Sequence, residues 1–210
     1  MDEQELQDVM DDRMFAYRFL AQAFRAAPTT SFLQALKDSD MVDDALLGDF
    51  IVSLRTADLE ALKTDLGAEY ARVLLNMSAH PVPPFESVYS SPEKLLMQDA
   101  RDEVVAAYQS EGLGVVEDFR EPEDHVATEF EFMAYLCEKA SAALATGDEQ
   151  AVAHYQKTQC DFFQHHLASW VPAFCDDFEK QVTTLYYRGI CALTRQQIAM
   201  DADFLASVSR

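Results

Sequence analysis

Several features that mark common protein classes are scarce or absent in this sequence of 210 residues. Glycine occurs only 6 times, and the apolar–polar alternation that is typical of β-strands is almost absent. No apolar run approaches the ~18 residues that indicate a membrane-spanning helix. The N-terminus is acidic, whereas a secretory signal begins with basic residues. We therefore expect neither a β-protein nor a membrane-inserted protein, and we predict a cytoplasmic location.

Metal and redox patterns are also absent. The sequence contains no C-x-x-C pair, and its four cysteines are Cys137, Cys160, Cys175 and Cys191. In a chain of this length without an export signal, we expect reduced, buried thiols. A metal site is conceivable from a group comprising His154, Cys160, His165 and His166. Its spacing matches no zinc pattern, and adjacent histidines point in different directions on a helix. We predict no metal and no cofactor.

Basic residues are few. There are 16 lysines and arginines against 37 aspartates and glutamates, which gives a formal net charge of -21. Such a surface repels nucleic-acid phosphates and anionic membranes, and it attracts basic peptides. Solubility alone would also explain the acidity. We predict no nucleic-acid partner and no direct membrane insertion.

Catalytic motifs are missing as well. There is no phosphate-binding glycine loop, no dinucleotide G-x-G-x-x-G and no G-x-S-x-G elbow. A di-iron bundle needs Glu-x-x-His, and no histidine here has a glutamate three residues before it. Glu129 and Glu131 are two residues apart, so on a helix they face away from each other, and we expect solvated or locally paired carboxylates. We predict that the chain is not an enzyme; a catalytic bundle remains an alternative that a metal assay would test.

Helical periodicity dominates what is present. It predicts an all-α fold, a single-domain bundle of about eight to ten helices over residues 1–210. The strongest stripe lies in 122–146, where apolar residues on more than one side indicate a central helix that Gly147 ends. We expect irregular segments near 77–91 and 111–121. The expected helices span 3–26, 31–37, 43–54, 56–76, 91–110, 122–146, 149–167, 172–187 and 190–207.

The starts of three helices are predicted from local signals. Thr56 is expected to be the N-cap of the helix that ends near residue 76. Ser91 is expected to be an N-cap with Pro92 in the first helical position, and Pro122 is expected to begin the central helix.

The proline-rich segment 77–91 is unusual because it retains apolar residues. Three prolines hold the chain extended, yet the segment keeps Val82, Phe85, Val88 and Tyr89. Apolar residues on a stiff extended loop either pack onto the body or form a binding surface. We favour packing, and both interpretations remain open.

A second segment, 117–131, holds seven acids and one arginine. We expect Asp124 and His125 in the first turn of the helix that Pro122 begins. An acid there is stabilised by the helix dipole and by unpaired backbone N–H groups. A purely structural role therefore explains these residues as readily as a binding role.

Three segments resemble motifs of one family, in that family's order. Residues 69–74, E-Y-A-R-V-L, resemble its E-Y-x-R-L-F helix end; 83–89, P-P-F-E-S-V-Y, resemble P-P-Y-E-S-V-Y; and 121–125, E-P-E-D-H, resemble E-P-x-D-H. Residues 129–133, E-F-E-F-M, are similar to its E-L-x-F-M. The sequence thus resembles the TorD/DmsD/NarJ family of molybdoenzyme assembly chaperones (redox enzyme maturation proteins), and within it the TorD-like branch. It departs from the pattern where 73–76 read V-L-L-N instead of L-F-V-G, and where Phe85 replaces the usual Tyr or Trp.

The resemblance implies a helical chaperone that binds the twin-arginine leader of a molybdopterin-dependent oxidoreductase. It would hold the precursor in the cytoplasm until the cofactor is inserted. The matching leader-binding positions are Tyr70, Val73, Leu74, Pro84, Phe85, Asp124 and His125. Asp124 could accept a hydrogen bond from an arginine, Glu121 and Glu123 could add negative field, and Tyr89 could cover the apolar part of the leader. The family's domain-swapped forms leave a homodimer open.

Two other functions are compatible with the sequence. An assembly chaperone that recognises the mature enzyme would need no arginine pair. A maturation factor that binds molybdenum cofactor or a nucleotide is the other, although the acidity and the missing phosphate loop disfavour phosphate-bearing ligands.

Overall fold

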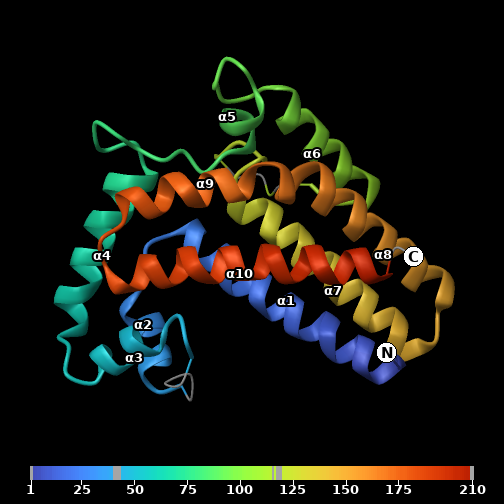
Figure 1. The fold of residues 1–210 in the computed structure, drawn as a ribbon, viewed down its shortest axis with the longest axis horizontal. Coiled ribbons are helices and arrows are strands. Elements are labelled where there is room, and N and C mark those ends of the chain that lie inside the picture. The colour runs from blue at the N-terminus through green and yellow to red at the C-terminus, as the bar shows by residue number, and fades with distance from the viewer. Residues whose placement is uncertain (1, 40–43, 115, 117–119, 209–210) are drawn as a thin grey trace. The chain divides into compact units, whose positions relative to one another are not determined.

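The fold is helical throughout the part of the chain that the computed structural model describes, residues 2–39, 44–114, 116 and 120–208 (Figure 1). The α-helices run from α1 to α10, which confirms the predicted all-α class. A π-helix, η2, separates α8 from α9. The elements are α1 (Glu3–Arg25), α2 (Thr30–Lys37), α3 (Gly48–Leu54), α4 (Leu59–Leu74), α5 (Glu86–Ser90), α6 (Asp99–Ser110), α7 (Val126–Thr146), α8 (Glu149–Phe162), η2 (Phe163–Leu167), α9 (Ala168–Gln181) and α10 (Leu185–Val208).

The chain divides into two compact units. Unit 1 comprises residues 1–22, 85–172 and 197–210, and unit 2 comprises 23–84 and 173–196. Helices α1, α9 and α10 each supply residues to both units. The expectation of a single domain over 1–210 stays a prediction.

Helix α7 is the centre of unit 1, as its two-sided apolar pattern predicts. Phe130 lies 5.6 Å from Tyr17 between ring centroids, and Phe132 lies 4.8 Å from Tyr108 and 4.7 Å from Phe162. These side chains are all buried, and each stabilises the fold by about 1.5–3 kcal/mol relative to an exposed position. Gly147 ends α7 with φ of 68°, the left-handed conformation expected of a C-terminal glycine.

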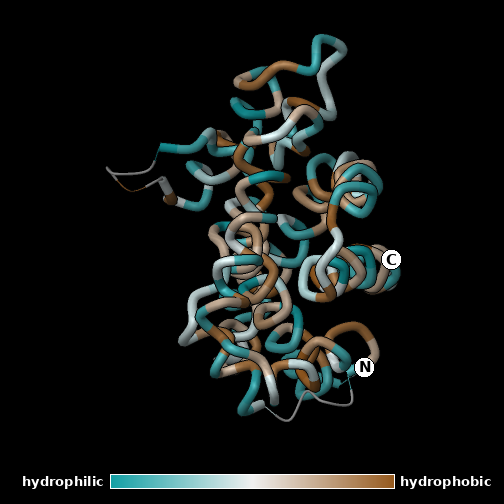
Figure 2. Tube along the Cα trace, turned by 90° about the vertical axis from the view of Figure 1, so that its left-hand side faces the viewer, coloured by the Kyte–Doolittle hydropathy of each residue, from teal (hydrophilic) through white to brown (hydrophobic). Residues whose placement is uncertain are grey.

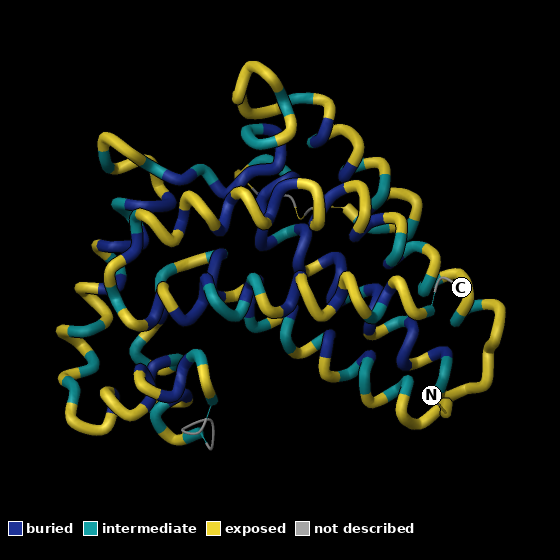
Figure 3. The backbone as a smooth tube through the Cα atoms, viewed as in Figure 1, coloured by how far each residue is buried: buried dark blue, intermediate teal, exposed yellow. Residues whose placement is uncertain are grey.

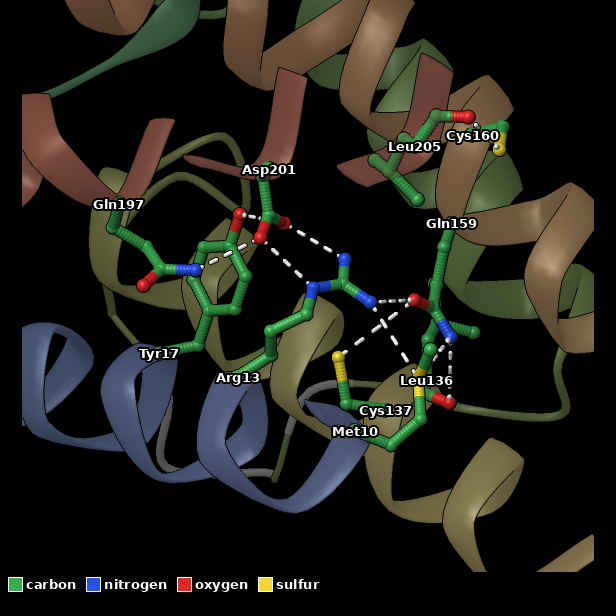
Figure 4. A network of polar contacts seen from close by, with 10 residues as sticks. All are labelled: Met10, Arg13, Tyr17, Leu136, Cys137, Gln159, Cys160, Gln197, Asp201 and Leu205. Carbon is green, nitrogen blue, oxygen red and sulfur yellow. Dashed lines mark hydrogen bonds and ion pairs between the residues drawn. The ribbon is translucent and has the colours of Figure 1, made fainter. Parts of the chain in front are cut away.

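A buried polar network joins α1, α7, α8 and α10 inside unit 1 (Figure 4). The Arg13 guanidinium donates to both carboxylate oxygens of Asp201, from Nε at 2.8 Å and from Nη2 at 2.7 Å. The Tyr17 hydroxyl donates to the same carboxylate at 2.6 Å, and Arg13 also donates to the Gln159 side chain. Because burial and then Asp201 oppose ionisation, the pKa of Tyr17 is raised well above its usual range. The network satisfies a charge pair that would otherwise be costly to bury.

Unit 2 is organised around clustered aromatic rings. The Phe24 ring lies 5.4 Å from Phe174 and 5.5 Å from Phe178, and the rings of Tyr186 and Tyr187 lie 4.8 Å apart. Where α10 passes the residues before α3, only a glycine fits. A Cβ added at Gly189 would lie 2.5 Å from a Leu47 methyl carbon and 2.8 Å from the Leu46 carbonyl oxygen.

Two predicted helix starts are wrong because other residues provide the caps. Helix α4 begins after Asp58, not Thr56, since the Asp58 carboxylate accepts from the backbone N–H groups of Glu60 and Ala61. The helix predicted over 43–54 is observed only at Gly48–Leu54, as α3, and residues 40–43 lie outside the described residues. Before α3, the Asp44 carboxylate accepts from the N–H groups of Leu46 and Leu47 and makes a turn.

The helix predicted from Ser91 begins only at Asp99. Residues 92–98 leave helical geometry because Lys94 and Met97 adopt positive φ, 53° and 60°. The Gln98 N–H at the end of this loop donates to the Ser87 hydroxyl at 3.1 Å, so the loop is tied to α5 instead of extending α6.

The predicted break at Pro172 is also wrong. The chain runs from α8 through the π-helix η2 into α9, and Pro172 lies inside α9 instead of starting it. Helix α10 begins at Leu185, earlier than the predicted residue 190. No helix in the described ranges is long and apolar enough to cross a membrane. All four cysteines are described, and none forms a disulfide.

Candidate functional site

The motif at residues 69–74 has a structural role in unit 2. The Glu69 carboxylate accepts hydrogen bonds from the backbone N–H and the hydroxyl of Thr183, both at 2.7 Å, and from the same groups of Thr184. Burial opposes ionisation of Glu69, but the Thr184 and Thr183 donors prevail and lower its pKa. Arg72 donates to the Gln181 carbonyl oxygen at 2.7 Å. The motif therefore attaches the turn between α9 and α10 to α4. The Thr184 hydroxyl, held by Glu69, in turn accepts from the Tyr187 N–H at 3.4 Å in the first turn of α10.

The four expected leader-binding positions of unit 2, Tyr70, Val73, Leu74 and Pro84, are all buried. The Tyr70 hydroxyl donates to the Phe24 carbonyl oxygen at 2.9 Å. The Val73 carbonyl oxygen accepts from the Val82 N–H at 2.8 Å. Val82 and Phe85 are buried too, so apolar residues of the proline-rich segment pack onto the protein, as we favoured.

The two motifs of unit 1 are hydrogen-bonded to each other. Phe85 and His125 form an isolated β-bridge, and their rings lie 5.0 Å apart. The Asp124 carbonyl oxygen accepts from the Glu86 N–H at 3.0 Å, and its carboxylate Oδ2 accepts from the Ser87 N–H at 2.8 Å. Asp124 therefore caps α5, a short helix within the segment 77–91 that we predicted to be irregular.

Helix α7 starts at Val126, so the prediction that Pro122 begins it is wrong. The His125 side chain accepts from the Ala127 N–H at 3.1 Å and serves as the N-cap of α7. Asp124 and His125 thus precede the first turn. The signal for a helix start was present, but the capping side chain lies later in the motif than the proline suggests.

The acids of the E-P-E-D-H motif differ in accessibility. Glu123 accepts from Arg101 Nε at 2.6 Å and Nη2 at 2.7 Å, and these bonds lower the pKa of Glu123. Asp124 is fully buried, and its Oδ1 has no hydrogen-bond partner among the described residues. Glu121 is exposed. Residues 115 and 117–119, within the irregular segment predicted at 111–121, lie outside the described residues.

A buried carboxyl group missed by sequence reasoning lies behind these motifs. Glu129, expected to be solvated or locally paired, is fully buried and accepts from the Trp170 indole N–H at 3.0 Å. Glu86 is 2% exposed, and one carboxylate oxygen lies 2.9 Å from His166 Nδ1. Burial first, and the Glu86 carboxylate second, raise the pKa of Glu129 well above its usual range. The expectation of a solvated Glu129 fails because α7 is central.

Tyr89, another expected leader-binding position, is half-buried, and its ring centroid lies 5.5 Å from that of Trp170.

The histidines that suggested a metal site do not converge. Nε2 of His154 lies 2.9 Å from a carboxylate oxygen of Glu111, and Nδ1 of His165 lies 2.8 Å from the Asp161 carbonyl oxygen. Within the described parts of the chain, no three His, Cys, Asp or Glu residues are grouped as metal ligands.

Described residues of unit 1 line two hollows with acidic side chains. The larger, of about 550 Å³, is lined by residues that include Glu103, Glu111, His154 and His165. The smaller, of about 360 Å³, is called here the acidic hollow; its acidic lining residues are Glu86, Glu93, Asp99 and Glu103. No lysine or arginine lines either one.

Comparison with known proteins places the chain in a family. The profile described as "Nitrate reductase delta subunit" matches residues 35–176, more than half of the sequence. The chain belongs to the nitrate reductase delta subunit family. This family comprises the TorD- and NarJ-like assembly chaperones of molybdoenzymes, which confirms the resemblance seen in the motifs. Its members are non-catalytic, which confirms the prediction that the chain is not an enzyme.

Individual members of the nitrate reductase delta subunit family agree with this assignment. "Chaperone protein TorD" from Vibrio atlanticus is 25% identical over 188 residues, covering 87% of this chain and 84% of its own. "Chlorate reductase assembly chaperone protein" from Ideonella dechloratans is 37% identical over 82 residues, covering 39% of this chain and 42% of its own. A crystal structure described as a redox enzyme maturation protein from Archaeoglobus fulgidus superimposes with a TM-score of 0.50 at 21% identity, over 87% of this chain and 91% of that chain. That structure supports the fold.

Proposed function

We propose that this chaperone acts in the cytoplasm by binding the twin-arginine leader of a molybdopterin-dependent oxidoreductase precursor. It holds the precursor, in its apo-form, until the cofactor is inserted. The observation that carries the proposal is a net charge of -21 on a member of this assembly-chaperone family. A strongly acidic chaperone attracts a basic leader and speeds its encounter.

The proposed leader-binding positions divide by accessibility. Glu121 is exposed and adds negative field for the leader, whereas Glu123 already pairs with Arg101. The other eight positions are buried or half-buried and act by shaping the surface of their own unit. They are Tyr70, Val73, Leu74 and Pro84 in unit 2, and Phe85, Tyr89, Asp124 and His125 in unit 1.

Recognition of the mature enzyme alone is the contrasting function, and it requires no arginines. A nucleotide or molybdopterin is a poorer fit to the two hollows of unit 1, because no basic residue lines either of them. A domain-swapped homodimer stays a prediction, and light scattering at several protein concentrations would test it.

Calorimetric titration tests the leader proposal. The ligands are leader peptides from molybdoenzymes encoded in the same genome, each beside a matched peptide with both arginines replaced by alanine. We expect saturable binding to one leader and at least ten-fold weaker binding after replacement. No binding to any leader, together with binding to a folded, cofactor-loaded enzyme, would contradict the proposal and favour recognition of the mature enzyme.

A further inference from the structure

The loop of residues 91–98, between α5 and α6, presents an apolar group to solvent. Leu95, Leu96 and Met97 are 57%, 45% and 56% exposed. Figure 2 shows an apolar stretch in this loop, and Figure 3 shows the loop as mostly exposed. Adjacent large apolar side chains in water lose the favourable free energy of burial and often mark an interaction surface. We call these three residues the apolar rim.

The same loop forms part of the acidic hollow. Ser91, Pro92 and Glu93 line the hollow from the beginning of the loop, and Gln98 and Asp99 line it from the end. The apolar rim therefore lies on the chain between two walls of the acidic hollow. The bond from the Gln98 N–H to the Ser87 hydroxyl closes the base of this loop.

Three of the four acids that line the acidic hollow have no cationic partner in the described chain, and the fourth, Glu86, lies 2.9 Å from His166 Nδ1. Glu93, Asp99 and Glu103 are exposed lining residues, and none makes an ion pair with another described residue. The neighbouring Arg101 is paired with Glu123 and Asp102. Lys94 is the one basic residue of the loop and is absent from the lining. The hollow therefore carries a negative field that favours a cationic guest.

We infer that the acidic hollow and the apolar rim together bind a peptide in which adjacent arginines are followed by apolar residues. This inference rests on the proposed function and assigns the arginines of the leader to the acidic hollow. A guanidinium offers five donors that pair with carboxylates in bidentate geometry. Ser91 also lines the hollow, and its buried hydroxyl has no hydrogen-bond partner in the described chain. The apolar residues of the peptide cover the apolar rim.

The acidic hollow differs from Asp124 as an arginine site. Asp124 is fully buried and caps α5 through Oδ2, so an arginine could reach it only if that helix moved. The exposed carboxylates of the acidic hollow need no such movement.

Three variants of the full chain test the inference by calorimetry with a leader that binds the wild type. The hollow variant is Glu93→Gln, Asp99→Asn, Glu103→Gln. The control variant is Glu3→Gln, Asp12→Asn, Asp203→Asn, which removes three exposed acids of unit 1 that line neither hollow. The rim variant is Leu95→Ser, Leu96→Ser. Circular dichroism and melting curves verify that each variant is folded, and titrations at two salt concentrations report the electrostatic part of binding.

We expect the hollow variant to bind about ten-fold or more weakly and with less salt dependence, while the control variant keeps wild-type affinity. Alanine replacement of the leader arginines should reduce the affinity of the hollow variant much less than that of the wild type. The reason is that the substitutions in the hollow and those in the leader remove the same contacts. The rim variant should bind about three-fold or more weakly, both to the arginine-containing leader and to the peptide in which alanine replaces the arginines.

Equal affinity of the hollow variant and wild type, or equal losses in the hollow and control variants, would overturn the inference and leave the proposed function standing. A wild type that binds no leader at all would overturn both.

Discussion

The buried Glu129 carboxyl predicts an unusual dependence of stability on pH. Its Oε2 accepts from the Trp170 indole N–H, while its Oε1 is buried without a hydrogen-bond partner in the described chain. The facing acids are Glu86 on α5 and Asp124 before α7, and Tyr108 on α6 feels the same negative field. Burial and then Glu86 raise the pKa of Glu129 well above its usual range. Folding therefore favours the protonated form.

The sign of the effect follows from proton linkage. Below the pKa of an unfolded glutamate, about 4.3, Glu129 is protonated in both the folded and the unfolded state. Its ionisation then takes nothing from the free energy of unfolding. As pH rises above that value, the unfolded state releases the proton and the folded state keeps it. Stability is then lost at about 1.4 kcal/mol per pH unit, until pH reaches the raised pKa of the folded protein.

Glu129→Gln should remove this loss. A glutamine oxygen can still accept from Trp170, and its amide can donate toward Glu86, so the core keeps its volume. We expect the variant to become more stable than wild type by about 1.4 kcal/mol for each pH unit above 4.3, with no advantage at lower pH. The pH at which the advantage stops growing gives the folded pKa of Glu129.

Urea denaturation from pH 4 to pH 8 measures the difference. The matched control is Glu131→Gln, an exposed acid two residues further along α7, which should leave the slope unchanged. Parallel pH profiles for wild type and Glu129→Gln would refute the reasoning, since they would mean that Glu129 ionises in the folded state as it does in the unfolded state.

Three further predictions concern other buried acids. Asp201→Ala should lower the free energy of unfolding by about 3–5 kcal/mol because it leaves the Arg13 charge buried and unpaired; denaturant titration measures this, and a loss under 1 kcal/mol would contradict it. The lowered pKa of Glu69 adds stability above the unfolded glutamate pKa, and this stability is lost as pH falls through the folded value. Glu69→Gln should therefore flatten the acid side of the stability profile, and an unchanged acid side would contradict the stabilising role of its bonds to Thr183 and Thr184. Asp124→Asn should keep leader affinity because asparagine also caps helices, whereas Asp124→Ala should lose about 1 kcal/mol of stability and some affinity; equal affinity losses in both would instead identify a direct charge contact.

The long helices could be predicted from sequence because their signals are local. The apolar stripe of 122–146 and the glycine at its end are both visible within one segment, and the structure has α7 with Gly147 at its C-terminus. The first helix, predicted over 3–26, is observed at Glu3–Arg25 for the same reason.

Two of the missed boundaries, at α5 and α10, involve residues that are distant in sequence. Asp124 caps α5 from 37 residues away, and Glu69 accepts from Thr183, in the turn before α10, from 114 residues away. No local pattern contains these partners. The π-helix η2 follows a run of ordinary helical residues, so its departure from the α-helical hydrogen bonds has no sequence signature.

The candidate site shows the same limit. The motif residues could be identified from their order, and Asp124 was expected in the first turn of a helix. Its burial could not be predicted, because it follows only from the packing of one motif against another. The acidic hollow was not visible either, because its walls come from both ends of a loop that we predicted to be helical and from the distant His165.

The two motifs of unit 1 lead by hydrogen bonds to the acidic hollow. Asp124 accepts from the Ser87 N–H, and the Ser87 hydroxyl in turn accepts from the Gln98 N–H, at the end of the loop that carries the apolar rim. Glu86, whose N–H is bonded to the Asp124 carbonyl oxygen, lines the hollow itself. A change at Asp124 can therefore alter leader binding without any contact between Asp124 and the leader. Loss of binding in Asp124→Ala identifies a contact residue only if Asp124→Asn, which preserves the chain of bonds, loses binding as well.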